Sequence, residues 1–509
     1  MHKKSSRSRL AAVRPFLLPA LSAVLLILSY PKFNQGWLAW FALAPLSAYI
    51  LKSKTLKAAA AGGAACGFLF YLGILYWIYP TMRAGGVNPG VSALGLVLLS
   101  LILSSEFLLV SIFGYRIKKI GVKRWPYLFA LGWFLLEYGK LYVSLEAAWF
   151  PWFMLGYTQW DYAPLIQVSS LTGVYGLSAA VCFSGALLGS LFALKAPVYK
   201  KILRFSPAIL VFAGIWGFGR RELIRAETAA PSSSFRAALL QPSIDLYAKW
   251  DAAEAGNIKA GIEGLLAGAK GADLVVWPEN ALPCWIDEPE CGDWLKGVIS
   301  SGAARGSIVG SVSKGAGKHV SAFLLDGKGA ITGSYDKRQL VPFGEYVPLR
   351  DFLGRYIQPV AALGEFEPGN REQKLLDFNG TKIGAAICYE SVFPYLFAGD
   401  TRDGAEVFVN ITNDGWYLDT AAPYQHFIAN IFRAVENRRT VVRAANNGIS
   451  AVIDPWGRVL VKTALNERTV VSVAVPVYAG QAFFPLYGHR FILAALIIFS
   501  AFLLAVLFV

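Results

Sequence analysis

Charged residues are scarce in this sequence: Asp, Glu, Lys and Arg make up 16% of its 509 residues, whereas 55% are apolar. Soluble globular proteins carry about 25% charged residues, so this composition excludes an ordinary soluble protein. Histidine is also rare, and His2, His319, His426 and His489 are too scattered for a histidine-based metal site. A phosphate-binding glycine loop and a dinucleotide-binding fingerprint are both missing from the sequence. The sequence therefore predicts neither a metal nor a nucleotide cofactor.

Long apolar runs fill the first half of the chain. A helix needs about 20 apolar residues to cross a bilayer, and eight stretches approach this length: 12–30, 36–51, 58–80, 90–114, 125–144, 163–194, 204–219 and 488–509. Buried helices of a large soluble protein are the alternative, but repeated runs with so few charges favour membrane spans. We therefore expect a multi-pass α-helical membrane domain at 1–220, a domain of globular composition at 232–478, and an eighth transmembrane helix at 488–509.

The positive charge of the chain, formally +15, lies mainly in short loops on one side of the predicted membrane. Basic clusters precede the first span and follow the second, fourth and sixth spans, whereas loops after odd-numbered spans carry few basic residues. This is the positive-inside pattern of membrane proteins, and it argues against nucleic acid as the partner. It predicts a cytoplasmic N-terminus and places the 232–478 domain outside the cytoplasm. Arg220, Arg221 and Arg225 depart from the pattern, but long exported domains cross the membrane largely regardless of charge.

Cysteine is another rare residue, with five in the chain. Cys66 and Cys182 lie in apolar runs and are expected to be inert packing residues. Cys284 and Cys291 lie in the predicted exported domain, where a disulfide can persist, but their spacing alone leaves open whether they are joined. Cys388 stands alone in the same domain.

From Phe235 onward the pattern changes to short apolar runs that alternate with helical stretches. Strands are predicted at 235–241, 274–277, 307–313, 320–326, 374–378, 382–388, 407–411, 440–445, 450–453 and 470–475, and helices near 252–269, 293–304, 392–398 and 423–439. The Asn446-Asn447-Gly448 sequence between two of these strands is typical of a tight hairpin. Nearly continuous apolar strands that alternate with helices indicate an α/β domain in which helices cover the sheets.

Three short motifs of this domain carry the groups that a cysteine nucleophile needs. Glu279 and Cys388 each follow an apolar strand, and Lys337 stands between Asp336 and Arg338. A carboxylate can act as the base, an ammonium group supplies positive charge, and a thiol attacks. The turn that follows Cys388 leads into a helix, whose free N–H groups favour a thiolate and an oxyanion. Taken singly, each residue has a structural explanation: a packed core cysteine, a solvated strand-end glutamate or a solvated run of charges.

Together, the three residues resemble the Glu–Lys–Cys catalytic triad of the nitrilase superfamily, whose fold is an αββα sandwich. Residues 337–346 resemble the lysine-motif extension of that superfamily, and residues 410–416 resemble its downstream strand-and-loop motif. With membrane spans on both sides of the domain, the whole chain resembles the apolipoprotein N-acyltransferase family. Residues 148–152 and 167–176 resemble motifs of the membrane half of that family. The resemblance implies a membrane domain joined to an α/β nitrilase-like αββα sandwich.

The resemblance also implies a reaction and a location. An acyl chain passes from a membrane phospholipid to the α-amino group of the N-terminal diacylglyceryl-cysteine of an apolipoprotein, in the inner membrane of a bacterium. Residue chemistry fits a two-step route in which Cys388 carries the acyl chain as a thioester, Glu279 moves protons and Lys337 stabilises the oxyanion. We expect no cofactor, a monomeric enzyme and a periplasmic catalytic domain.

Supporting roles follow from the same resemblance for Glu345, Tyr389 and Glu390. Glu345 is expected to orient or charge-balance the catalytic lysine, and Glu390 to hold the turn after the nucleophile or to position the amine. Trp250 matches an aromatic residue that the family places near the acyl group, and a packed core tryptophan is an equal alternative. Trp416 is a candidate for lining the route of the substrate.

Two other functions are open to a chain with these features. A membrane-tethered nitrilase or amidase would pass the acyl group of its thioester to water, but one anchor would suffice for it. A transporter or scaffold with a degenerate nitrilase domain is the third possibility, and the intact triad argues against it. Glu106 and Glu137 lie in or near apolar spans, where a charge is either functional or held by structural hydrogen bonds.

Overall fold

The computed structural model describes residues 16–146, 149–194, 196–246, 249, 251, 253–302, 304–313, 317–347, 366–480 and 482–507. Trp250, which the resemblance places near the acyl group, lies outside the described residues, so its role stays a prediction.

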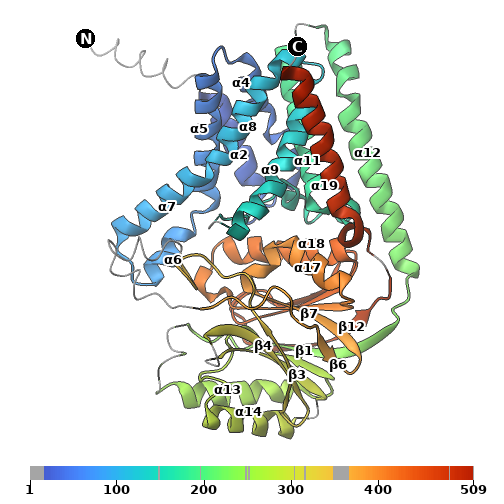
Figure 1. The fold of residues 1–509 in the computed structure, drawn as a ribbon. Coiled ribbons are helices and arrows are strands. Elements are labelled where there is room, and N and C mark those ends of the chain that lie inside the picture. The colour runs from blue at the N-terminus through green and yellow to red at the C-terminus, as the bar shows by residue number, and fades with distance from the viewer. Residues whose placement is uncertain are drawn as a thin grey trace.

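Helices form one end of the molecule, and two sheets with their covering helices form the other (Figure 1). The main helices of the first half are α2 (Leu17–Ser29), α3 (Ala39–Ala42), α4 (Ala44–Lys52), α5 (Leu56–Ile74), α6 (Ile78–Ala84), α7 (Pro89–Leu103), α8 (Ser105–Arg116), α9 (Trp125–Glu146), α10 (Ala163–Ile166), α11 (Ser169–Ala193) and α12 (Val198–Thr228). The last helix, α19 (Phe483–Leu507), returns from the sheets and packs against α9 and α11.

Six helices in the described part of the chain are long and apolar enough to cross a membrane: Leu56–Ile74, Pro89–Ile120, Trp125–Leu145, Ser169–Ala193, Val198–Thr228 and Phe483–Ala501. The first half is therefore a multi-pass α-helical membrane domain, as expected. On α12, Leu203 and Leu210 expose 72% and 70% of their surface. Large apolar side chains that point outward fit a helix whose outer face meets lipid.

Some predicted spans are interrupted or divided into short helices. The 36–51 stretch consists of a 3₁₀ turn (Gly36–Leu38) and the short helices α3 and α4. Within α11, Gly173 has φ 65° and ψ −179°, so the helix is interrupted there. A Cβ atom at Gly173 would lie 2.6 Å from the ring of Phe484, so glycine allows α19 to approach the break. The count of eight spans and the domain boundaries stay predictions.

Two six-stranded sheets make up the domain that follows α12. The first has the strand order β12-β1-β2-β3-β4-β5 and the second β11-β10-β9-β8-β7-β6. Their strands are β1 (Ser233–Gln241), β2 (Leu274–Val276), β3 (Gly306–Ser313), β4 (His319–Asp326), β5 (Ile331–Asp336), β6 (Leu376–Phe378), β7 (Thr381–Ile387), β8 (Val407–Thr412), β9 (Thr440–Ala445), β10 (Ala451–Ile453), β11 (Val459–Lys462) and β12 (Thr469–Val477).

Helices cover the outer face of each sheet, which gives the expected αββα sandwich (Figure 1). The first sheet is covered by α13 (Ala255–Leu266) and α14 (Pro289–Ser301), and the second by α17 (Pro394–Arg402) and α18 (Ala422–Asn437). Because successive side chains of a strand point to opposite faces, Leu239 of β1 packs with Val409 of the second sheet, whereas Leu240 packs with Ile262 of α13. One core therefore lies between the sheets and another beneath the outer helices.

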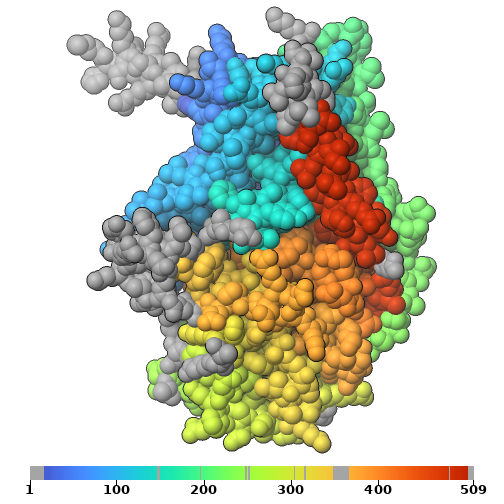
Figure 2. Space-filling model, viewed as in Figure 1, coloured from blue at the N-terminus to red at the C-terminus, as the bar shows by residue number. Residues whose placement is uncertain are grey.

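The helix α18 connects the sandwich to the membrane half. Every residue of α18 except Tyr424 is buried, and Phe432 belongs to the same apolar cluster as Trp133 of α9. Glu436 of α18 accepts a hydrogen bond of 2.9 Å from the N–H of Val174, just after the break in α11. In Figure 2 the orange helices of the sandwich meet the blue-green membrane helices directly. The two halves therefore share one continuous core.

The strands and helices predicted for the sandwich domain are all present, with shifted ends, and the hairpin at Asn446–Gly448 joins the antiparallel strands β9 and β10. Two strands, β5 and β11, were not predicted. Each lies at an edge of its sheet. The sequence of β5 (Ile331–Asp336) is mostly polar, and β11 is only four residues long. Cys284 and Cys291 form a disulfide, which answers the question that their spacing left open.

Candidate active site

Cys388 lies at the point where β7 ends and a short 3₁₀ turn (Cys388–Val392) begins. Its backbone has φ 52°, in the left-handed region that residues other than glycine rarely adopt. Such strained positions are frequent at functional sites, where the surrounding structure holds them in place. The residue is 6% exposed and packs in the core between the two sheets. The strand-to-turn position predicted from the sequence is therefore confirmed.

Lys337 directly follows the edge strand β5 and is almost completely buried. Its backbone N–H donates to the carbonyl of Val320, which fixes the residue to β4. The Nζ atom lies 3.3 Å from Oε1 of Glu279 and 2.5 Å from Oε1 of Glu345. The second oxygen of Glu345 accepts a hydrogen bond of 2.9 Å from the N–H of Val341. Two carboxylates therefore balance the buried ammonium group, and the expected role of Glu345 fits this contact.

Glu279 follows β2 and reaches across to the second sheet. Its Oε2 atom accepts a hydrogen bond of 2.9 Å from the N–H of Asn413, just after β8. The carboxylate is thus held between Lys337 of one sheet and the backbone of the other. The three predicted triad residues follow the carboxyl ends of β2, β5 and β7, and the charges of Glu279 and Lys337 both act on the ionisation of Cys388.

The protonation states at this site follow from burial and from neighbouring charges. Burial and the charge of Glu279 raise the pKa of Cys388, while Lys337 and a hydrogen bond from Thr412 oppose that rise. Burial alone would lower the pKa of Lys337, but Glu279 and Glu345 outweigh it and hold that pKa above its ordinary value. The resting site therefore contains a neutral thiol beside a charged lysine. A thiol in this state needs a base before it can attack.

This balance predicts the pH dependence of a simple reaction, alkylation of Cys388 by a small soluble reagent. Only the thiolate reacts, and a free cysteine is half ionised near pH ~8.5. Because the pKa of Cys388 is raised, we expect the alkylation rate to keep increasing from about pH 8 to about pH 10. Lys337→Met removes the charge that lowers the pKa of the thiol, so alkylation should become slower at each pH. A rate that levels off below pH ~8 would contradict the raised pKa.

Glu390 is completely buried and joins the lysine motif to the turn that contains Cys388. One carboxylate oxygen accepts backbone N–H groups of Arg338 at 2.7 Å and Gln339 at 3.0 Å. The other accepts the N–H of Ile387 at 2.7 Å, and Tyr335 donates its hydroxyl to both oxygens. Burial raises the pKa of Glu390, and Arg338 opposes the rise. Of its two expected roles, these contacts support holding the turn.

A second group of buried residues contacts the backbone of Cys388. Nε2 of His426 lies 2.9 Å from the carbonyl oxygen of Cys388, and Nδ1 lies 2.8 Å from Asp414. Arg443 donates to the other oxygen of Asp414 at 2.8 Å. Burial opposes the charge of Asp414, but Arg443 and His426 outweigh it and lower its pKa to about 2. These residues hold the backbone of Cys388 in place.

Tyr389 presents its ring to the membrane half. It stacks on Phe150 and Trp152, with ring centroids 6.1 Å apart in each case and interplanar angles of 11° and 16°. Tyr417 joins the same aromatic group through Trp152, at 5.9 Å. The neighbouring Trp416 is 53% exposed, so it faces outward rather than into this group. The aromatic side chains of the two halves of the chain therefore meet at Tyr389, the residue after Cys388.

Three contacts near the triad were not predicted from the sequence. Asn413 donates to Glu279 and Thr412 bonds Cys388, and both belong to the downstream motif, which was the available signal. Lys249 is 4% exposed and donates from Nζ to the carbonyl of Asn280, the residue after Glu279. Burial lowers the pKa of Lys249 to about 7, against the pull of Glu279. A single lysine in a short loop gave no signal in the sequence. Among the described residues, no group of His, Cys, Asp and Glu is arranged to hold a metal.

Two family models match the two halves of the chain. Residues 22–187 match the apolipoprotein N-acyltransferase N-terminal domain, and residues 236–482 match the carbon-nitrogen hydrolase family. An amidase from Nesterenkonia sp. aligns at 21% identity with a TM-score of 0.38, over 49% of this chain and 92% of that chain.

Relatives that span the full chain are more informative. The chain is 36% identical over 492 residues to the apolipoprotein N-acyltransferase of Geobacter metallireducens, which covers 94% of this chain and 92% of that protein. It is 32% identical over 501 residues to that of Rickettsia bellii, over 95% of this chain and 97% of that protein. Because these relatives match both halves over nearly their whole length, the chain belongs to the apolipoprotein N-acyltransferase family.

Proposed function

We propose that this chain transfers an acyl chain from a membrane phospholipid, through a thioester on Cys388, to the α-amino group of the N-terminal diacylglyceryl-cysteine of an apolipoprotein. The names of its relatives support an acyl transfer to apolipoprotein. One observation carries the proposal for this chain: a buried cysteine, coupled to Glu279 and Lys337, adjoins aromatic side chains of a membrane domain. A thiol in that position suits an acyl donor that resides in the bilayer.

The first step forms the acyl-enzyme. Glu279 takes the proton of the Cys388 thiol, and Sγ attacks the ester carbonyl carbon of the phospholipid. The tetrahedral intermediate then collapses as the ester C–O bond breaks. The leaving lysophospholipid oxygen receives the proton from Glu279, so charge and protons balance.

Negative charge develops on the former carbonyl oxygen during this attack. Lys337 supplies a buried positive charge that acts on Cys388, and the backbone N–H of Tyr389 lies at the start of the turn after Cys388. Two such donors, fixed before the reaction begins, stabilise an oxyanion without reorganising during the step. Glu345 supports the step by holding the ammonium group at 2.5 Å.

The second step releases the acyl chain to its acceptor. The α-amino group of the lipoprotein cysteine attacks the thioester carbonyl, and Glu279 removes the proton of the amine. An amide bond forms, the C–S bond breaks, and the thiolate of Cys388 recovers a proton from Glu279. We assign Tyr389, Trp416 and Trp250 to substrate binding, and Glu390 to support of the turn.

The orientation in the membrane completes the proposal. The basic loops favour an N-terminus in the cytoplasm and a catalytic domain in the periplasm of a bacterium, with the chain acting as a monomer in the inner membrane. Membrane domains at 1–220 and 488–509 then flank the catalytic domain at 232–478, and the phospholipid donor comes from the surrounding bilayer.

The decisive experiment is incubation of the purified chain with phospholipid that carries a labelled acyl chain. We expect the label to become covalently attached to the chain, to be released by hydroxylamine, and to move to a diacylated lipopeptide when that acceptor is added. Cys388→Ala should lose all of the attached label. Cys66→Ala is the matched control because Cys66 is also a buried free cysteine. Release of the acyl group to water at the same rate with or without lipopeptide would instead indicate a membrane-tethered amidase.

A further inference from the structure

Residues 149–154 have no regular secondary structure, and a 3₁₀ turn (Leu155–Gln159) follows them. We refer to residues 149–156 as the strap. Backbone N–H and C=O groups outside helices need partners when they are buried at membrane depth. The partners of the strap come from side chains of α8, α9 and α11 and from Tyr30, next to α2.

Ionisable side chains provide the central part of this support. Lys140 of α9 donates from Nζ to the carbonyl oxygen of Phe153, and it lies 3.4 Å from Glu106 of α8. Glu137 of α9 accepts the N–H of Leu155 at 2.7 Å. All three ionisable side chains are less than 9% exposed.

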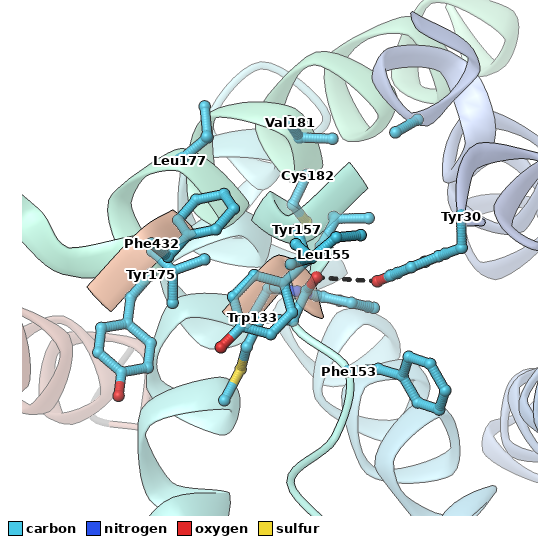
Figure 3. Packing of buried hydrophobic residues seen from close by; sticks show 14 of the residues in the cluster. Tyr30, Trp133, Phe153, Leu155, Tyr157, Tyr175, Leu177, Val181, Cys182 and Phe432 are labelled. Atoms are coloured by element: carbon cyan, nitrogen blue, oxygen red, sulfur yellow. Dashed lines mark hydrogen bonds between the residues drawn. The ribbon is translucent and has the colours of Figure 1, made fainter. Parts of the chain in front are cut away.

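Neutral side chains provide further hydrogen bonds to the strap. Tyr30 donates to the carbonyl oxygen of Met154 at 2.9 Å, which is the dashed contact in Figure 3. Ser178 accepts the N–H of Gly156 at 2.7 Å. At the start of the strap, the indole of Trp149 donates to Glu106 at 2.9 Å. Four consecutive residues, 153–156, therefore each have a backbone group bonded to a membrane-helix side chain or to Tyr30.

The polar support also surrounds a small cavity of about 20 Å³, lined by Tyr30, Tyr71, Glu106, Glu137 and Lys140 among others. A cavity of that size holds one water molecule. Figure 3 shows the apolar side chains of Trp133, Phe153 and Leu155 packed in this region.

The other face of the strap meets the nucleophile turn. Phe150 and Trp152 stack on Tyr389, the residue after Cys388. The Trp152 indole also lies 5.1 Å from the ring of His426 and donates to Gln425 at 3.2 Å. A displacement of the strap would therefore shift the ring of Tyr389. It would also shift His426, which bonds the carbonyl of Cys388.

We infer that Glu106, Glu137 and Lys140 are positioning residues for acyl transfer: they fix the strap so that Phe150 and Trp152 hold Tyr389 beside the nucleophile. This inference rests on the proposed function of Cys388. Charges inside membrane domains often mark ion or proton pathways. Here each of the three side chains instead bonds the strap, through Trp149, Phe153 or Leu155. What the strap needs from Glu137 is an acceptor oxygen, and a negative charge is not required for it.

Substitutions of Glu137 and Lys140 test the inference. Glu137→Gln keeps an acceptor oxygen, so we expect acyl transfer within about threefold of the wild-type rate. Glu137→Leu and Lys140→Met leave buried backbone groups of the strap unpaired, and we expect at least about 30-fold slower acylation of Cys388 by phospholipid. Alkylation of Cys388 by a small soluble reagent should stay within about threefold, because the triad residues are untouched. Hydrogen exchange at residues 149–156 should become faster in the two slow variants.

Tyr49→Phe is the control, because it removes one partly buried hydrogen bond of the membrane half, from Tyr49 to the carbonyl of Ala58, away from the strap. Loss of activity in Glu137→Gln equal to that in Glu137→Leu would overturn the inference, because it would show that the charge itself acts. Parallel loss of lipid acylation and thiol alkylation would also overturn it, because it would show a general loss of structure. If the wild-type chain forms no thioester, the proposed function is wrong, and unchanged hydrogen exchange of the strap would then refute the positioning role separately.

Discussion

Glu279→Gln should reduce acyl transfer by about 1,000-fold while making the thiol of Cys388 easier to alkylate. General base catalysis contributes roughly 10²–10⁴-fold, and an amide cannot accept the proton. The same substitution removes a negative charge that raises the pKa of Cys388. A lower pKa gives more thiolate at neutral pH, so alkylation by a small reagent becomes faster. Transfer of a labelled acyl chain and mass-spectrometric alkylation rates, measured on the same preparation, check both directions.

These opposite effects distinguish a base from a structural residue. Damage to the fold would slow both acyl transfer and alkylation of Cys388. If Glu279 acted only through its charge, acyl transfer would be nearly unchanged in Glu279→Gln. Glu263→Gln is a suitable control because Glu263 is exposed and accepts a surface hydrogen bond of 2.7 Å from Trp294. It should change neither rate. Transfer that survives in Glu279→Gln would require another base, and the assignment of Glu279 would then be wrong.

Glu390→Gln should destabilise the catalytic domain by about 3 kcal/mol, although the two side chains have almost the same shape. Both oxygens of Glu390 accept backbone N–H groups, from Ile387 on one side and from Arg338 and Gln339 on the other. In either orientation, the amide group of glutamine places its own N–H groups against a donor. A buried polar group left unpaired costs roughly 1–3 kcal/mol, and more where a charge-assisted bond is lost. Denaturant titration of the solubilised chain measures the change in the free energy of unfolding.

The control for this substitution is an exposed ion pair. Asp377 and Lys382 lie 2.5 Å apart, and their side chains are 50% and 48% exposed. Asp377→Asn should cost no more than about 1 kcal/mol, because solvent already screens the pair. A similar cost for Asp377→Asn and Glu390→Gln would show that Glu390 does not hold the lysine motif and the nucleophile turn together.

The accuracy of the sequence-based prediction differs between parts of the fold for a physical reason. Central strands such as β7 and β8 are buried on both faces, so their apolar runs are visible in the sequence. The edge strand β5 was missed because much of it is exposed and polar, with Ile331 at 54% exposure. That strand carries Lys337 at its end. The lysine was recognised by its motif, whereas the strand that positions it was not.

The break in α11 is a second example. The apolar run at 163–194 predicts one long helix, and the interruption at Gly173 depends on neighbours from distant parts of the chain. Phe484 fills the space beside the glycine, and Glu436 bonds the N–H of Val174. Both residues lie more than 250 positions away along the sequence. Local hydropathy cannot report such partners.

The sequence by itself determined that this chain enters a membrane, since only repeated apolar runs with few charges produce such helices. It also identified Glu279, Lys337 and Cys388, because each stands in a short motif with a recognisable neighbourhood. Only the tertiary structure decided how these groups are held: two carboxylates on one lysine, Glu390 across two motifs, and the strap on Tyr389. These contacts join residues far apart in the chain, and burial decides which charges must find partners there.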